Sequence, residues 1–171
     1  MIDKTYESLQ RAVADVHDGA TVMIGGFGNA GMPSALIDAL YRAGKIELEL
    51  TPQGNLAERI RAAGAGIGGF FTPTGYGTLL AEGKETRLIN GRHYVLESPI
   101  HADFALIKAL RGDRWGNLVY RKTARNFGPI MAMAARTTIA QVQDVVALGE
   151  LDPEVIVTPG IFVQRVVKEN A

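Results

Sequence analysis

The stretch that decides the fold runs from Asp18 to Pro33 and reads DGATVMIGGFGNAGMP. Residues 21–24 form a short apolar run typical of a buried strand. Pro33 suits the first turn of a helix, where its missing N–H is not needed. The glycines between them tolerate positive φ and have no Cβ to keep a ligand away from the backbone. The stretch therefore predicts a strand, a glycine turn and a helix start, whose N–H groups favour an anion or a developing oxyanion.

Residues 26–31 also fit the G-x-G-x-x-G pattern that holds a dinucleotide, in the strand-then-helix context that this pattern requires. The pattern further needs an acidic residue at the end of a second parallel strand, about 20 residues on. Here Glu47 and Glu49 instead alternate with apolar residues inside the strand expected over residues 46–50. A dinucleotide-binding module is therefore one alternative, and a turn that only closes a tight bend is another.

The composition is that of an ordinary globular chain, and it excludes several kinds of site. A length of 171 residues suffices for one domain with a hydrophobic core, and 18 basic residues cancel 18 acidic ones. Because no block of lysines or arginines occurs, we expect neither a nucleic-acid nor a membrane partner. The absence of cysteine excludes thiol nucleophiles and thiolate metal sites. Three scattered histidines and no membrane-length apolar run predict no metal site and a cytoplasmic location.

The rest of the chain alternates between helical and strand-like patterns. We expect helices over residues 5–16, 33–40, 56–63 and 129–135, and strands over residues 46–50, 104–110, 137–146, 154–157 and 162–167. Asn90-Gly91 predicts a hairpin between residues 86–89 and 93–96. Since residues 104–110 are apolar on both faces except for Lys108, they predict a central parallel strand. The pattern indicates one α/β domain over residues 1–171, with an open, mostly parallel sheet, flanking helices and a small β excursion.

Together these motifs resemble the A subunit of the family I coenzyme A transferases, of the succinyl-CoA:3-oxoacid type. The opening signature of that family matches from Asp18 through Pro33 without exception. Further blocks look the same over residues 51–61, 72–78, 116–127 and 158–165. Residues 112–115 and 127–133 look most like the branch that acts on 3-oxoadipate. The resemblance spans nearly the whole chain and implies the Rossmann-like sheet of that family.

The resemblance implies that two kinds of subunit contribute different parts of the catalytic chemistry. The reaction moves CoA from succinyl-CoA to a 3-oxo acid, with 3-oxoadipate favoured and acetoacetate next. It passes through a glutamyl-CoA thioester, and in the family that glutamate lies on the partner, the B subunit. The glutamates of this chain lie in no nucleophile turn, so we expect activity only with the B subunit, in an A2B2 heterotetramer. A coenzyme A thioester and small carboxylic acids would be substrates, with no permanently bound cofactor.

Gln53 is the candidate catalytic residue. Its neutral amide can donate to a developing oxyanion without forming an ion pair with a nucleophilic glutamate, and the resemblance implies an oxyanion-hole glutamine in this Thr-Pro-Gln-Gly block. The alternative is that Gln53 only caps the following helix. We expect the acyl or CoA portion to lie along the glycine turn, at Gly25, Gly26, Phe27, Gly28, Asn29, Ala30 and Gly31. The basic cluster of Arg121, Lys122 and Arg125 would pair with CoA phosphates or a dicarboxylate substrate, or it would form a surface that faces solvent or the other subunit.

One departure from the family pattern affects the sheet. The resemblance implies a further stretch between Leu40 and Tyr41, about 40 residues or more and thus the size of one strand–helix–strand unit. Here Leu40 runs straight into Tyr41. Either the unit has been deleted or the sequence is incomplete. A deletion would remove a central part of the sheet and favour a third interpretation, that of a non-catalytic interaction protein.

Overall fold

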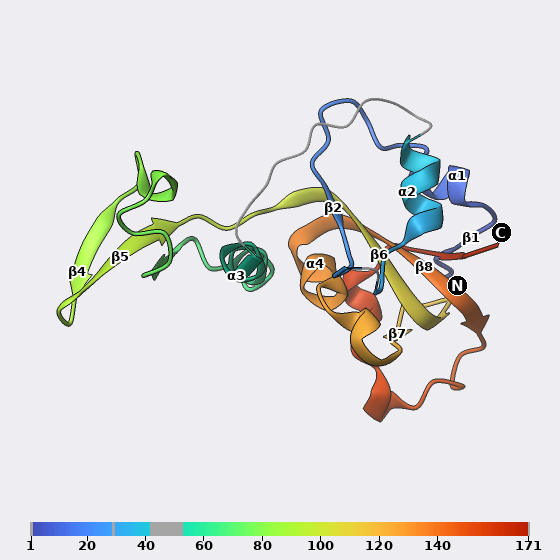
Figure 1. The fold of residues 1–171 in the computed structure, drawn as a ribbon. Helices are drawn as coiled ribbons and strands as arrows, with labels where there is room; N and C mark the ends of the chain where they lie inside the picture. The colour runs from blue at the N-terminus through green and yellow to red at the C-terminus, as the bar shows by residue number, and fades with distance from the viewer. Residues whose placement is uncertain (1, 29, 42–52, 171) are drawn as a thin grey trace.

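The computed structural model describes residues 2–28, 30–41 and 53–170, and its centre is a mostly parallel sheet (Figure 1). The sheet has the order β1-β9-β8-β6-β2, and each neighbouring pair in that order is parallel. The five strands are β1 (Thr5–Tyr6), β2 (Val22–Ile24), β6 (Ala102–Asp113), β8 (Ala135–Val146) and β9 (Arg165–Lys168). A short strand, β7 (Leu118–Val119), pairs antiparallel with β6. The predicted α/β class with a mostly parallel sheet is confirmed.

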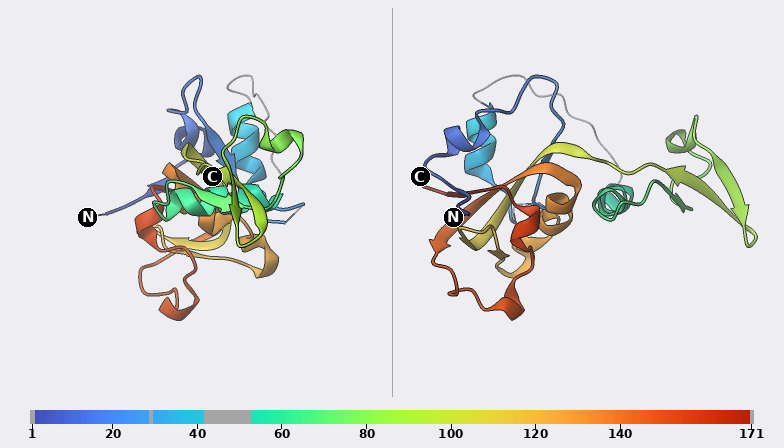
Figure 2. Two further views of the ribbon diagram at one scale, coloured as in Figure 1. Left: turned by 90° about the vertical axis from the view of Figure 1, so that its left-hand side faces the viewer. Right: turned by 180° about the vertical axis from the view of Figure 1, so that it is seen from behind.

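Helices cover both faces of this sheet (Figure 2). On one face, α1 (Leu9–Val13) and α2 (Ser34–Tyr41) pack over Phe104 and Leu106 of β6. On the other, α3 (Gln53–Gly64) and α4 (Gly128–Ala134) belong to the core that includes Ala105 and Ile107. Because successive side chains of a strand point to opposite faces, β6 is buried on both sides, which explains its nearly continuous apolar run.

A slender antiparallel sheet projects from the body, and we call it the arm (Figure 1). It consists of β3 (Phe70–Thr72), β4 (Thr86–Ile89) and β5 (Arg92–Glu97) in the order β3-β5-β4, with a short 3-10 helix, η1 (Leu79–Ala81), between β3 and β4. At its tip, Asn90 and Gly91 have φ of 50° and 76°. Positive φ at both central residues defines the tight hairpin turn that Asn-Gly predicts. The predicted β excursion is confirmed. α3 lies between the arm and the body (Figure 2).

The helix expected over residues 5–16 is wrong in its first part. Thr5 and Tyr6 are extended and pair with Val166 and Val167. The helix begins only after Ser8, whose Oγ accepts from the backbone N–H of Arg11. The apolar stripe that predicted one long helix therefore serves two elements, because pairing at the edge of the sheet overrides helical periodicity in the first turn.

The strand expected over residues 154–157 is also wrong. Residues 153–155 form a 3-10 helix, η3 (Pro153–Val155), in which the Asp152 carboxylate accepts from the backbone N–H of Glu154. This local hydrogen bond stabilises a turn in place of the backbone pairing with another strand that a β-strand would need. Similarly, η4 (Gly160–Phe162) takes the start of the strand expected from residue 162, and β9 begins at Arg165.

The remaining elements lie close to their expected positions. α2, α4 and β8 match within one or two residues, whereas α3 begins at Gln53, three residues before the expected start. The strand expected over residues 46–50 lies outside the described residues. None of the helices in the described ranges is long and apolar enough to span a bilayer.

Candidate functional site

The glycine turn leaves the carboxyl end of β2 and runs to the start of α2. The backbone N–H of Gly25 still donates to the carbonyl of Leu106 at 2.8 Å. Beyond it, Phe27 and Ala30 exchange two backbone hydrogen bonds of 3.0 and 3.1 Å. Gly26, Gly28 and Gly31 have positive φ, which glycine adopts without strain. Because the N–H groups of Phe27 and Ala30 are bonded within the turn, they are not free to bind an anion.

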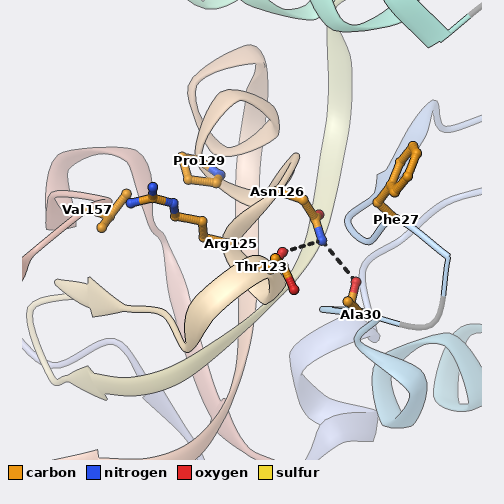
Figure 3. A pocket seen from close by; sticks show the side chains of 7 residues that line it. All are labelled: Phe27, Ala30, Thr123, Arg125, Asn126, Pro129 and Val157. Carbon is orange, nitrogen blue, oxygen red and sulfur yellow. Dashed lines mark hydrogen bonds between the residues drawn. The ribbon is translucent and has the colours of Figure 1, made fainter.

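A second segment holds this turn in place. This segment contains η2 (Lys122–Arg125) and Asn126, whose Nδ2 donates to the carbonyl oxygens of Ala30 and Thr123, each at 3.0 Å (Figure 3). A Cβ at Gly31 would clash with the carbonyl oxygen of Ala124. The close approach of the two backbones therefore requires glycine at position 31.

An aromatic contact completes this junction. The rings of Phe27 and Phe127 stack with centroids 6.4 Å apart and planes inclined by 23°. Phe27 is nevertheless 60% exposed, so one of its faces remains available for contact with a ligand or another chain.

Two adjoining pockets open at the junction, and they share Phe27 and Asn126. One has a volume of about 650 Å³ and is lined by Phe27, Ala30, Thr123, Arg125, Asn126, Pro129 and Val157 (Figure 3). The other has a volume of about 330 Å³ and is lined by Phe27, Gln53, Ala57, Asn126, Phe127 and Ile130. The volumes are in the range of ligand-binding clefts.

The structure brings Gln53 and part of the glycine turn to one pocket. Gln53 is the first residue of α3, and Ala57, one turn later, lines the same wall. Of the seven turn positions predicted to bind ligand, Phe27 and Ala30 line the pockets. Gly25 is instead buried beneath the turn against Ile107, Gly28 is exposed, and Asn29 lies outside the described residues.

The polar character of the pockets comes from few side chains. Arg125 is the charged residue that lines the larger pocket, whereas Arg121 and Lys122 line neither pocket. Behind the site, Tyr120 supports the start of α4: its hydroxyl lies 2.7 Å from Thr158 Oγ1, and its ring packs closely on Gly128. Burial raises the pKa of Tyr120 to about 12, so this phenol is neutral at physiological pH.

No metal centre accompanies this site in the described part of the chain, where no group of three or more His, Cys, Asp or Glu side chains could hold an ion. The polar side chains that line the two pockets are those of Gln53, Thr123, Arg125 and Asn126, and the remaining lining residues are apolar.

Sequence reasoning missed several residues of the site, above all Asn126 and Phe127. They directly precede the start of α4, but nothing local indicates their contact with a turn about a hundred positions earlier in the chain. The hydrogen bond between Asn126 and Ala30 spans 96 positions. The sequence marks them only as part of the 116–127 block that resembles the family.

Comparison with known proteins shows the class of this chain. The model of the coenzyme A transferase family matches residues 6–45 and 40–169, and the chain belongs to that family. It is thus a transferase chain of the α/β class described above.

Individual relatives show which members of the family the chain is similar to. The chain is 60% identical to the A subunit of the 3-oxoadipate CoA-transferase of Pseudomonas putida, over 98% of this chain and 94% of that protein. It is 45% identical to the A subunit of the succinyl-CoA:3-ketoacid coenzyme A transferase of Xanthomonas campestris, over 96% of this chain and 88% of that protein. An acyl-CoA transferase of E. coli O157:H7, solved as a thioester complex with CoA, has the same fold, with a TM-score of 0.85 at 20% identity. The superposition covers 97% of this chain and about half, 49%, of that one.

Proposed function

We propose that this chain is the A subunit of a heteromeric enzyme that moves CoA from succinyl-CoA to a 3-oxo acid, with 3-oxoadipate favoured and acetoacetate next. The observation that carries the proposal is the pocket lined by both Gln53 and Phe27, to which α3 contributes a neutral amide and the glycine turn an aromatic ring. The substrate preference is supported by identities of 60% and 56% to two 3-oxoadipate CoA-transferase A subunits, against 45% for a succinyl-CoA:3-ketoacid one.

The chemistry requires a carboxylate nucleophile. Attack of a glutamate on the acyl-CoA carbonyl forms a tetrahedral oxyanion, which collapses to a mixed anhydride as the CoA thiolate leaves. The thiolate then attacks the glutamyl carbonyl, releasing the carboxylate product and leaving a glutamyl-CoA thioester; the acceptor acid reverses both steps. In this scheme the Gln53 amide donates to the oxyanion, and the glycine turn lies beside the acyl or CoA portion.

The resemblance to the family implies that the nucleophile lies on the partner, the B subunit, and two glutamates of this chain are engaged in other interactions. Glu58 of α3 accepts from Arg61, which holds the pKa of this carboxyl below its ordinary value. Glu97 is buried and bonded to Lys84. An A2B2 assembly in which the B subunit covers the open pockets is consistent with the exposure of Phe27.

We also propose that the single domain of residues 1–171 lacks a strand–helix–strand unit near positions 40 and 41. Two observations support this. The alignment with the Pseudomonas relative runs over 217 residues, more than the 171 of this chain. The two family-model matches, over residues 6–45 and 40–169, also overlap at the same point, as expected if the model contains a segment between them that the chain does not have.

The remaining proposals concern the surroundings of the reaction. A CoA thioester enters as substrate and no cofactor is permanently bound. The balanced charge of 18 basic and 18 acidic residues supports neither a nucleic-acid nor a membrane partner. A cytoplasmic enzyme of aromatic or ketone-body catabolism fits these properties.

The test is reconstitution. The purified chain should show no transfer from succinyl-CoA to 3-oxoadipate until the B subunit is added, and one turnover should then leave a thioester on that partner. Transfer by this chain alone would contradict the proposal that the nucleophile lies on the B subunit. If the chain instead binds NADH and the mixture forms no thioester, the dinucleotide-binding alternative is correct; a chain that binds the B subunit without any transfer would be a non-catalytic interaction protein.

A further inference from the structure

Glu97 is a buried carboxylate that the proposed chemistry does not use. It ends β5 of the arm and is 2% exposed. Its Oε1 accepts from Asn55 Nδ2 at 3.0 Å and from Lys84 Nζ at 2.8 Å, while Arg59 Nε lies 3.7 Å from Oε2. Asn55 and Arg59 lie one turn apart on α3, and Lys84 belongs to the arm. One carboxylate therefore joins the helix to the root of the arm.

The surrounding backbone strengthens this joint. Arg59 Nε donates to the carbonyl oxygen of Ser98 at 2.7 Å, and the backbone N–H of Ile100 donates to the carbonyl of Arg59 at 3.1 Å. α3 is thus bonded through Asn55 and Arg59 to residues 97–100. A buried carboxylate is tolerated only when it is paired and hydrogen-bonded, so the geometry of its partners is tightly constrained.

The joint lies next to Gln53 in the sequence. Gln53 is exposed, and the following residue, Gly54, has no side chain with which to anchor the helix start. Asn55 is the first buried residue of α3, at 5% exposure. The first turn is therefore anchored by the bond from Asn55 to Glu97 and by the packing of Leu56 on the core, and not by Gln53 itself.

We propose that Glu97 is a positioning residue: through Asn55 it holds the first turn of α3 so that the Gln53 amide stays directed at the pocket. The proposal rests on the proposed function of Gln53. A shift of about 1 Å in a group that must meet a transition state can lower a rate a hundredfold, so a loosened helix start should reduce turnover without abolishing the fold.

The test is a double-mutant cycle in the complex with the B subunit. Glu97→Gln keeps the volume but removes the charge that orients Lys84 and Arg59, and both cations can still reach water. It also turns the charge-assisted bond from Asn55 into a weaker neutral one. We expect kcat to fall about tenfold, with KM for succinyl-CoA little changed. In a Gln53→Ala background the same substitution should cause almost no further loss, because the two act through one interaction. Glu85→Gln is the matched control: Glu85 is an exposed arm glutamate paired with Arg87.

A second variant and a second measurement make the test independent of activity. Asn55→Ala removes only the helix side of the joint and should reproduce the fall in kcat. In the chain without its partner, both variants should speed hydrogen exchange at the amides of residues 57–60, whose helical bonds go to the carbonyls of residues 53–56.

The outcomes separate the two proposals. Unchanged kcat and exchange in both Glu97→Gln and Asn55→Ala would overturn the positioning role, as would an equal loss of kcat with and without Gln53. Wild-type kcat in Gln53→Ala alone would instead refute the oxyanion role of Gln53, and the exchange rates would then decide whether Glu97 holds the helix.

Discussion

The side-chain amide of Asn126 donates to the carbonyl oxygen of Ala30 at 3.0 Å, joining the loop before α4 to the turn that follows β2. Both residues line the larger pocket, and Asn126 also lines the pocket of Gln53. This bond therefore determines the distance between two walls of the site.

Replacing Asn126 by alanine should loosen the glycine turn. The loss of two side-chain donor bonds should cost about 2 kcal/mol in the free energy of unfolding, at roughly 1 kcal/mol each, and should raise KM for CoA substrates in the complex. Urea unfolding and steady-state kinetics measure the two effects. Asn170→Ala, at an exposed position near the end of the chain, should change neither. An unaltered KM in Asn126→Ala would mean that the turn keeps its position without this bond.

Alanine substitutions at Gly31 and Gly28 can be compared to measure how closely the glycine turn packs against η2. Both have positive φ, but only a Cβ at Gly31 would meet the carbonyl of Ala124, whereas one at Gly28 would meet nothing within 4 Å. Gly28→Ala should destabilise by about 1–2 kcal/mol from backbone strain alone. Gly31→Ala should reduce the free energy of unfolding by clearly more than Gly28→Ala, because η2 must also move. Equal urea midpoints for the two variants would refute the close packing described for position 31.

Gln53→Ala tests the catalytic assignment. If the amide donates to the oxyanion, turnover in the complex should fall about 10²- to 10³-fold, and the melting temperature should hardly change. If Gln53 only supports the helix start, stability should fall by about 1 kcal/mol with turnover nearly intact. Single-turnover thioester formation distinguishes the two results, with Gln143→Ala, an exposed glutamine on β8, as the control.

The raised pKa of Tyr120 predicts that the stability of the chain depends on pH in the alkaline range. Its pKa in the folded chain is about 12, above the ordinary value of 10.0, because burial disfavours the charged phenolate. The stabilisation is fully present below pH 10 and is lost as the pH rises from there to 12, by at most about 1.4 kcal/mol per pH unit. Tyr120→Phe should lack this component, so the difference in unfolding free energy between wild type and variant should shrink over that range. A constant difference would contradict the raised pKa.

Much of the fold follows from local patterns. The apolar run of β6 predicts a central strand because both of its faces meet helices, and Asn90-Gly91 predicts the hairpin because both residues tolerate positive φ. The prediction of helix for Thr5 and Tyr6 is wrong because a ladder with β9, formed some 160 residues later in the chain, outweighs local periodicity.

The site is only partly predictable. The glycine turn and Gln53 are recognisable from residue types and spacing, and the structure brings Phe27 and Gln53 to one pocket. The clamp by Asn126 and the joint at Glu97 are not recognisable, since each depends on contacts between segments that only the folded sheet brings together. From sequence, Glu97 resembles any solvated or ion-paired glutamate, yet it is buried.

The position of β2 has a practical consequence. It pairs with β6 on one side, and no described strand covers its other side. Such a strand offers a row of N–H and C=O groups to which a strand of another molecule can add. If the residues outside the described ranges leave this side of β2 open, the chain kept without its partner should aggregate as its concentration rises, and light scattering should detect this. Thr21→Lys, at an exposed position just before β2, should slow the aggregation without altering either pocket. Producing the chain together with the B subunit would then improve its solubility, whether or not the complex is active.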